Sequence, residues 1–60
     1  MRLIRLSDVS HATGLRRSTI YKYIADGLFP KAVPLGGGRV AWVEHEVQDW
    51  IVERVRAREA

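Results

Sequence analysis

The side chains best suited to chemistry in this sequence gather in one short segment. They are basic or carry a hydroxyl group, and they are Arg16, Arg17, Ser18, Thr19, Tyr21 and Lys22. An arginine guanidinium can make two hydrogen bonds to a guanine edge, and hydroxyl groups can bond phosphates or bases. The helical period places Ser18, Thr19 and Lys22 on one exposed side, with the two arginines leading into the helix. The segment therefore predicts a short recognition helix for nucleic acid, with Tyr21 contacting a phosphate or packing beside a neighbouring helix.

Two of the basic residues outside this segment stand directly after turn-forming residues. Lys31 follows Pro30, and Arg39 follows the run Gly36-Gly37-Gly38. An arginine at the end of a glycine-rich turn can lie against a DNA backbone or enter a minor groove. The alternative is that Arg39 is an exposed turn residue without a partner. Lys31 either contacts a phosphate or has no role in binding.

No set of residues in the chain resembles a catalytic or metal-binding site. There is no cysteine, and no serine stands in a G-x-S-x-G motif. His11 and His45 fall on different predicted elements, and the neighbours in Glu44-His45-Glu46 point in different directions on a helix. We therefore expect no catalytic residue, no metal and no cofactor, and a protein that is not an enzyme.

Length and charge limit the class of protein. Sixty residues correspond to one small domain, here residues 1–60, and the net charge is +3. Residues 1–42 have a net charge of +5, whereas residues 43–60 have a net charge of −2. This asymmetry favours a polyanionic partner for the first two-thirds of the chain. The sequence contains neither a recognisable secretory signal nor a stretch apolar enough to span a membrane. We therefore expect a cytoplasmic protein, which lies at the bacterial nucleoid when it is bound to DNA.

The first half of the chain predicts two short helices joined by a tight turn. Ser7 stands as the N-cap of a helix over residues 8–13, which Gly14 ends. A second helix runs to Gly27, and its residues Ile20, Tyr23 and Ile24 should face inward. This is a helix-turn-helix over about residues 7–27.

The second half predicts a hairpin and a longer helix. Two β-prone runs flank the three glycines, so a hairpin, or wing, is expected over about residues 32–42, with Pro34 on an edge strand. A C-terminal helix is expected over about residues 44–58, although its start lacks a clear cap. Its apolar stripe comprises Val43, Val47, Trp50, Ile51 and Val55.

Three shorter predictions complete the architecture. Residues 3–6 should form a short strand or an extended lead-in, and Leu28 and Phe29 should be buried. Trp42 and Trp50 have apolar neighbours and should pack in the core instead of stacking on bases. The fold class is thus mainly α with a small β-hairpin wing, a winged helix-turn-helix.

These residues resemble those of the AlpA family, small phage- and prophage-type regulators whose fold is related to the MerR and excisionase winged helix. The resemblance covers almost the whole chain. Its most specific pieces are the runs Arg17-Ser18-Thr19-Ile20-Tyr21, Gly27-Leu28-Phe29-Pro30, Val40-Ala41-Trp42 and Glu46-Val47-Gln48-Asp49-Trp50-Ile51.

The resemblance implies a sequence-specific binder of double-stranded DNA that acts on a phage or mobile element. Family members control integrase expression or act as excisionases, and both roles stay open here. By this analogy Arg17, Ser18, Thr19, Tyr21 and Lys22 belong to the recognition helix and Arg39 to the wing. The family usually has a small capping residue at the position of Arg16. By this analogy the arginine adds a DNA contact, whereas the loss of the cap weakens the start of the helix.

Partners beyond DNA stay open as well. One small module reads only a few base pairs, so a homodimer or cooperative oligomer on DNA, or contact with an integrase or RNA polymerase, would raise specificity. The alternative from another class is a small protein-interaction adaptor that binds its partner through the C-terminal apolar helix.

Overall fold

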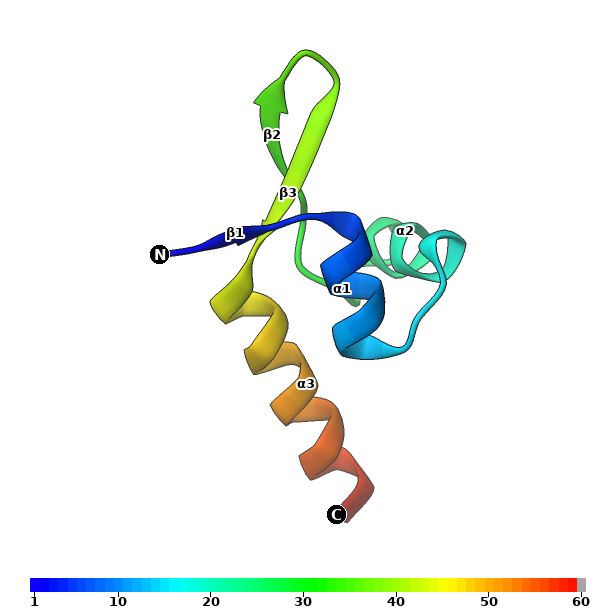
Figure 1. Cartoon of the computed structure of the whole chain (residues 1–60). Coiled ribbons are helices and arrows are strands. Elements are labelled where there is room, and N and C mark those ends of the chain that lie inside the picture. The colour runs from blue at the N-terminus through cyan, green and yellow to red at the C-terminus, as the bar shows by residue number, and fades with distance from the viewer. Residues whose placement is uncertain (60) are drawn as a thin grey trace.

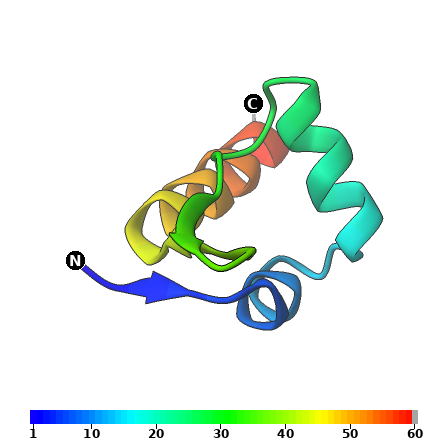
Figure 2. The same ribbon diagram turned by 90° about the horizontal axis from the view of Figure 1, so that it is seen from above.

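A computed structural model describes residues 1–59 (Figure 1). Its elements in chain order are β1 (Leu3–Ile4), α1 (Leu6–Thr13), α2 (Arg17–Ala25), β2 (Val33–Gly36), β3 (Arg39–Val43) and α3 (Glu44–Glu59). The strands form an antiparallel sheet in the order β1-β3-β2. Viewed along the hairpin, the three helices gather around its base (Figure 2). The predicted winged helix-turn-helix architecture is confirmed.

The first helix begins earlier than the sequence predicts. It starts at Leu6 and not at residue 8, so the prediction of Ser7 as its N-cap was wrong. The capping position falls to Arg5, whose backbone is extended because Ile4 just before it is paired with β3. The Asp8 carboxylate then accepts a hydrogen bond of 3.2 Å from the Arg5 backbone N–H. An acidic residue in this first turn also suits the helix dipole.

The turn between α1 and α2 is held by two side-chain hydroxyl groups. Gly14 adopts the left-handed conformation that ends α1, as predicted, and its N–H donates to the Ser10 carbonyl at 2.8 Å. The Ser10 hydroxyl donates to the Leu15 carbonyl at 2.7 Å, and the Thr13 hydroxyl accepts from the Leu15 N–H at 3.2 Å. These bonds fix the direction in which the chain enters α2.

The end of α2 is a Schellman motif, a helix end closed by two backbone bonds around a left-handed glycine. Gly27 has a φ of 73°, the Leu28 N–H donates to the Tyr23 carbonyl at 2.7 Å, and the Gly27 N–H donates to the Ile24 carbonyl at 3.1 Å. Phe29 is buried as predicted, but Leu28 is 59% exposed, so the prediction for Leu28 was wrong. The backbone of Leu28 closes the helix and accepts a hydrogen bond from the Trp50 indole N–H, while its side chain is exposed.

The wing is a hairpin that a third strand joins at its base. Residues Gly36, Gly37 and Gly38 all have positive φ, which lets the chain reverse without the penalty that a side chain would bring. Pro34 lies in the edge strand β2, as predicted. Only Leu3 and Ile4 of the predicted segment 3–6 form a strand, and they pair with Val43 and Trp42 of β3.

The C-terminal helix buries only its first half. Val43 is the last residue of β3 and not part of α3, which starts at Glu44. Val47 is 1% exposed, and Trp50 and Ile51 are half-buried against the core, whereas Val55 is 44% exposed. The predicted apolar stripe is thus packed against the core at Val47, Trp50 and Ile51. The prediction was wrong at Val43, which belongs to β3, and burial of Val55 was also wrong, because α3 extends beyond the body of the domain (Figure 1). Across residues 1–59, none of the helices has the length and apolar character needed to cross a membrane.

The core is small and centred on Trp42. It is a single cluster of buried side chains: Ile4, Val9, Ile20, Phe29, Trp42 and Val47. Each of the six comes from a different segment, so the cluster ties every element except β2 to the loop before the wing. Trp42 is fully buried and Trp50 packs against the cluster, which confirms that both indoles serve the core.

Candidate nucleic-acid interface

The polar side of α2 is exposed as the sequence predicts. Ile20 is buried, and Tyr23 and Ile24 are half-buried against the core, so the helix can turn only its other side outward. Arg17, Ser18 and Lys22 are exposed, whereas Thr19 is half-buried. Arg16 precedes the helix in an extended conformation, and no side-chain hydrogen bond caps the first turn.

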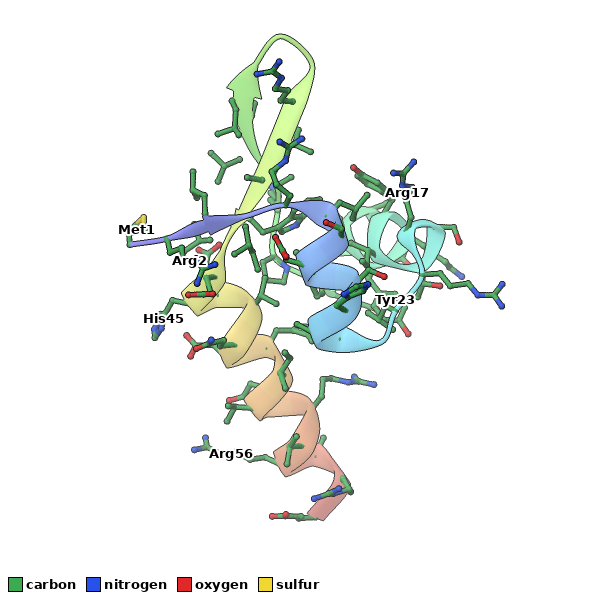
Figure 3. All side chains as sticks on the ribbon, viewed as in Figure 1. Met1, Arg2, Arg17, Tyr23, His45 and Arg56 are labelled. Atoms are coloured by element: carbon green, nitrogen blue, oxygen red, sulfur yellow. The ribbon has the colours of Figure 1, made fainter. Side chains whose placement is uncertain are left out.

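A groove runs between α2 and the wing. It has a volume of about 590 Å³, and its walls come from the start of α1, from α2 and from the wing. The lining residues are Arg5, Leu6, Ser7, Arg17, Tyr21, Gly38, Arg39 and Val40. Three arginines thus share one concave surface: Arg5 just before α1, Arg17 in α2 and Arg39 in β3. In Figure 3, Arg17 lies at the start of α2 and points to the side on which the wing stands.

Tyr21 is partly packed and partly exposed, and its contact with a phosphate stays a prediction. Its ring is tilted against Trp42, with the ring centroids 6.3 Å apart, and the residue is still 43% exposed. Packing on a fully buried indole restrains the ring, while its remaining surface faces the groove. The structure thus gives Tyr21 a fixed position in which its outer part is accessible to a ligand.

The charges of the groove differ from those of α3 in how they are paired. Four contacts of 4.0 Å or less between a basic and an acidic side chain occur within residues 1–59, and all of them involve α3: Arg2–Glu44, His45–Asp49, Glu53–Arg56 and Arg58–Glu59. None of the three groove arginines takes part in such a pair. The positive charge of the groove therefore has no acidic partner among the described residues, a condition that favours an anionic ligand.

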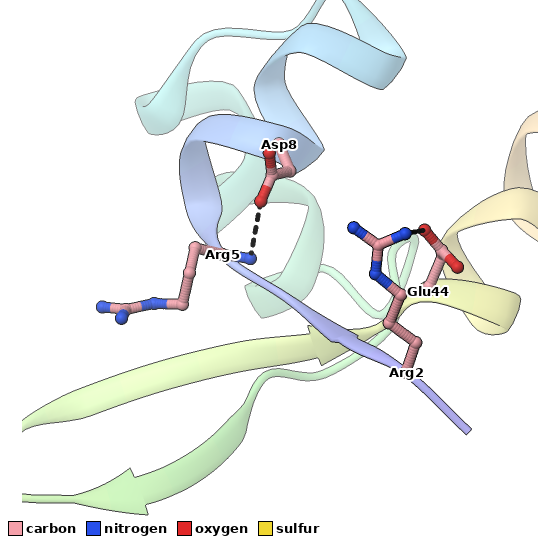
Figure 4. A network of polar contacts seen from close by, with 4 residues as sticks. All are labelled: Arg2, Arg5, Asp8 and Glu44. Carbon is pink, nitrogen blue, oxygen red and sulfur yellow. Dashed lines mark hydrogen bonds and ion pairs between the residues drawn. The ribbon is translucent and has the colours of Figure 1, made fainter.

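Arg5 is the groove residue that reasoning from the sequence missed. Its backbone N–H is held by Asp8, while its guanidinium points away from that carboxylate (Figure 4). Arg2, by contrast, turns toward Glu44, and its Nη1 lies 3.4 Å from that carboxylate. The only sequence signal for Arg5 was its place in the basic first two-thirds of the chain, since its position depends on the pairing of β1 with β3.

Lys31 is not brought together with the other predicted residues. It lines a different groove, of about 710 Å³, which also contains Glu46 and Asp49 at the start of α3. Within residues 1–59, no group of three or more histidine, cysteine, aspartate or glutamate side chains is arranged to hold a metal ion. The candidate interface is therefore the exposed side of α2, the groove beside it and Arg39 on the wing.

A two-helix unit with an exposed polar helix, an arginine-lined groove and an adjoining hairpin defines the winged helix-turn-helix class. The particular family follows from comparison with known proteins. The family described as prophage CP4-57 regulatory protein (AlpA) matches residues 2–55. The chain belongs to the AlpA family.

Two relatives make the comparison more specific. Over 57 residues the chain is 47% identical to the uncharacterized protein ORF88 of Enterobacteria phage P4, an alignment that covers 95% of this chain and 65% of that protein. Over 62 residues it is 36% identical to the DNA-binding transcriptional activator AlpA of Escherichia coli strain K12, covering 93% of this chain and 89% of that protein. The chain thus spans less than two-thirds of the length of the phage relative.

Proposed function

We propose that this chain is a sequence-specific binder of double-stranded DNA that regulates transcription of a phage or mobile genetic element. It acts in the bacterial cytoplasm, at the nucleoid, and it catalyses no reaction. The observation that carries this proposal is the groove in which Arg5, Arg17 and Arg39 lie unpaired beside the exposed side of α2. The name of the Escherichia coli relative, a DNA-binding transcriptional activator, supports it.

The arrangement suggests how the domain docks on the duplex. A B-DNA major groove about 12 Å wide admits an α-helix. With α2 in that groove, Arg17, Ser18 and Lys22 face the base edges and the neighbouring phosphates. The wing then lies along the adjacent backbone, where Arg39 contacts a phosphate or enters the minor groove.

Two finer roles fit the same surface. A promoter regulator, for example one that controls integrase expression, needs to bind a single operator, whereas an excisionase must bind adjacent sites and bend the duplex. A gel assay on attachment-site DNA separates them. A cooperative ladder of complexes together with a bend supports the excisionase role, and a single unbent complex removes it.

The interface of one such module is small, about 600–1,000 Å² by the usual range for single DNA-binding modules. We therefore propose weak binding by one copy, strengthened by a homodimer or cooperative oligomer on DNA, or by contact with an integrase or RNA polymerase. Analytical ultracentrifugation with a single-site duplex tests this, since a tight one-to-one complex would contradict it.

Selection of bound duplexes from a random DNA pool at near-physiological salt tests the central proposal. An enriched motif supports sequence-specific recognition, and the Arg17→Ala variant should lose that motif while the matched variant Arg56→Ala on α3 keeps it. Binding that enriches no motif and disappears as salt rises would show attraction to phosphates alone and would contradict the proposal.

A protein-interaction adaptor is the second candidate. It is favoured by a groove of about 350 Å³ between the helices, lined in part by Trp50, Ile51 and Val55, with Val52 also 45% exposed. In that case Arg17→Ala leaves partner binding unchanged and there is no DNA affinity to lose. The Val55→Asp variant would abolish partner binding instead.

A further inference from the structure

The groove beside α2 also indicates where one DNA strand runs. A duplex has its major and minor grooves separated by a single sugar-phosphate backbone. With α2 in the major groove and the wing toward the minor groove, that backbone has to pass between the two elements. The groove that Arg5, Arg17 and Arg39 line occupies this space, and the start of α1 forms its remaining wall.

We propose that this groove is a seat for the phosphodiester backbone of one DNA strand, and that Arg5 is its anchor. The inference rests on the proposed function and adds to it a phosphate-binding residue outside the predicted recognition helix and wing. Arg5 holds the phosphate and reads no base. Arg17, which lines the groove from α2, remains the residue proposed to contact base edges.

Three observations support this assignment to Arg5. Arg5 lines the groove, and its guanidinium makes no ion pair with a carboxylate of residues 1–59. Its backbone is fixed from both sides, by the pairing of Ile4 with Trp42 and by the hydrogen bond to Asp8. A guanidinium carried by a fixed backbone loses less freedom when it binds, and its planar donor fork suits phosphate oxygens.

The surroundings of Arg5 also suit an anion. Ser7 and Tyr21 add hydroxyl-bearing side chains to the groove, and its lining contains no carboxylate. The adjoining start of α2 has no side-chain cap, so its first N–H groups are free to meet a phosphate oxygen. The hydroxyl groups and the free N–H groups supplement the positive charge of the three arginines, and that charge is the main support for a phosphate site.

The test compares Arg5→Ala with Arg2→Ala, which removes the same charge from an arginine already paired with Glu44. Each protein is titrated with the selected duplex and with a scrambled duplex of equal composition over a range of salt. We expect Arg5→Ala to bind both duplexes about tenfold more weakly and to reduce the salt slope by about 0.9, the value for one phosphate contact. Arg2→Ala should behave as the wild type does.

A second experiment identifies the phosphate itself. Neutral methylphosphonates replace the phosphates of the selected duplex one at a time, and the wild type should bind weakly at one or two adjoining positions beside the α2 site. In Arg5→Ala, substitution at that position should no longer matter. Arg5→Gln, which keeps part of the side-chain stem, repeats the test, and circular dichroism melting of each variant verifies folding.

The outcomes distinguish the two proposals. If wild-type protein shows no salt-dependent binding to either duplex, the proposed function fails, and the phosphate seat fails with it. If wild-type protein binds but Arg5→Ala matches Arg2→Ala in affinity and slope, only the seat is overturned. A change in the selected motif for Arg5→Ala would likewise overturn the assignment of Arg5 to the backbone.

Discussion

The indole N–H of Trp50 donates a hydrogen bond of 2.7 Å to the backbone carbonyl of Leu28, 22 residues earlier in the chain. Trp42 makes the equivalent bond to the carbonyl of Pro30, at 3.2 Å. The two tryptophans therefore hold the middle of the loop that leads from α2 to the wing, at the residues on either side of the buried Phe29. Because α2 and the wing form the two sides of the candidate interface, these bonds set their relative position.

Substituting Trp50→Phe removes one of these bonds while keeping an aromatic ring beside Phe29, whose centroid lies 4.9 Å away. We expect the free energy of unfolding to fall by about 1–2 kcal/mol, since a hydrogen bond contributes about 1 kcal/mol and some buried area is also lost. Urea denaturation measures this change. An unchanged midpoint would mean that the loop needs no such anchor.

The two halves of α3 should respond differently to the same substitution. Val47→Ala removes two methyl groups from a site that is 1% exposed, and we expect a loss of about 2 kcal/mol. Val55→Ala, on the same helix at 44% exposure, should change stability by less than about 0.5 kcal/mol. Thermal unfolding of the two variants provides the comparison, and equal losses would contradict the burial pattern.

The turn between α1 and α2 depends on the Thr13 hydroxyl, which donates to the Val9 carbonyl at 2.8 Å and accepts from the Leu15 N–H. Thr13→Val keeps the shape of the side chain but leaves that N–H without its partner, which should cost about 1–2 kcal/mol. Ser7→Ala is the matched control. It should be nearly neutral because Ser7 is not the cap of α1, and a loss of about 1 kcal/mol there would restore the sequence prediction.

Arg17 and Lys22 should differ in the kind of DNA affinity that they supply. Arg17 is the first residue of α2, the helix proposed to enter the major groove, so Arg17→Ala should lower affinity for the selected duplex by about 1–3 kcal/mol more than for a scrambled one. Lys22→Ala should weaken binding to both duplexes to a similar degree, as expected for a phosphate contact. Fluorescence anisotropy on the two duplexes measures the ratio, and an equal loss for Arg17→Ala would remove it as a base-reading residue.

Much of the fold could be predicted because local rules decide it. Gly14 and Gly27 mark helix ends through a backbone conformation that favours glycine, and the three-glycine turn does the same for the wing. The helical period correctly placed Ile20 in the core, and the apolar neighbours of Trp42 correctly indicated its burial. Family membership followed from the same short runs of residues.

Two of the errors concern places where a distant segment contributes to the outcome. Ser7 is a good capping residue, yet β1 pairs with β3 and the chain enters α1 two residues earlier. Leu28 is apolar, yet its backbone closes α2 and accepts the Trp50 N–H, so its side chain faces solvent. The pairing of β1 with β3 and the bond from Trp50 to Leu28 both join residues far apart in the chain, so neither has a signal within the few residues around it.

The sequence by itself determined the three helices, the hairpin, the basic surface of α2 and the family. Composition and spacing decide these features, because they depend on backbone preferences and on periodic burial within one segment. Only the tertiary structure decided that Arg5, Arg17 and Arg39 share a groove while Lys31 lies in another beside Glu46 and Asp49. These residues are far apart in the chain, and the packing of α1, α2 and the wing around Trp42 brings them together.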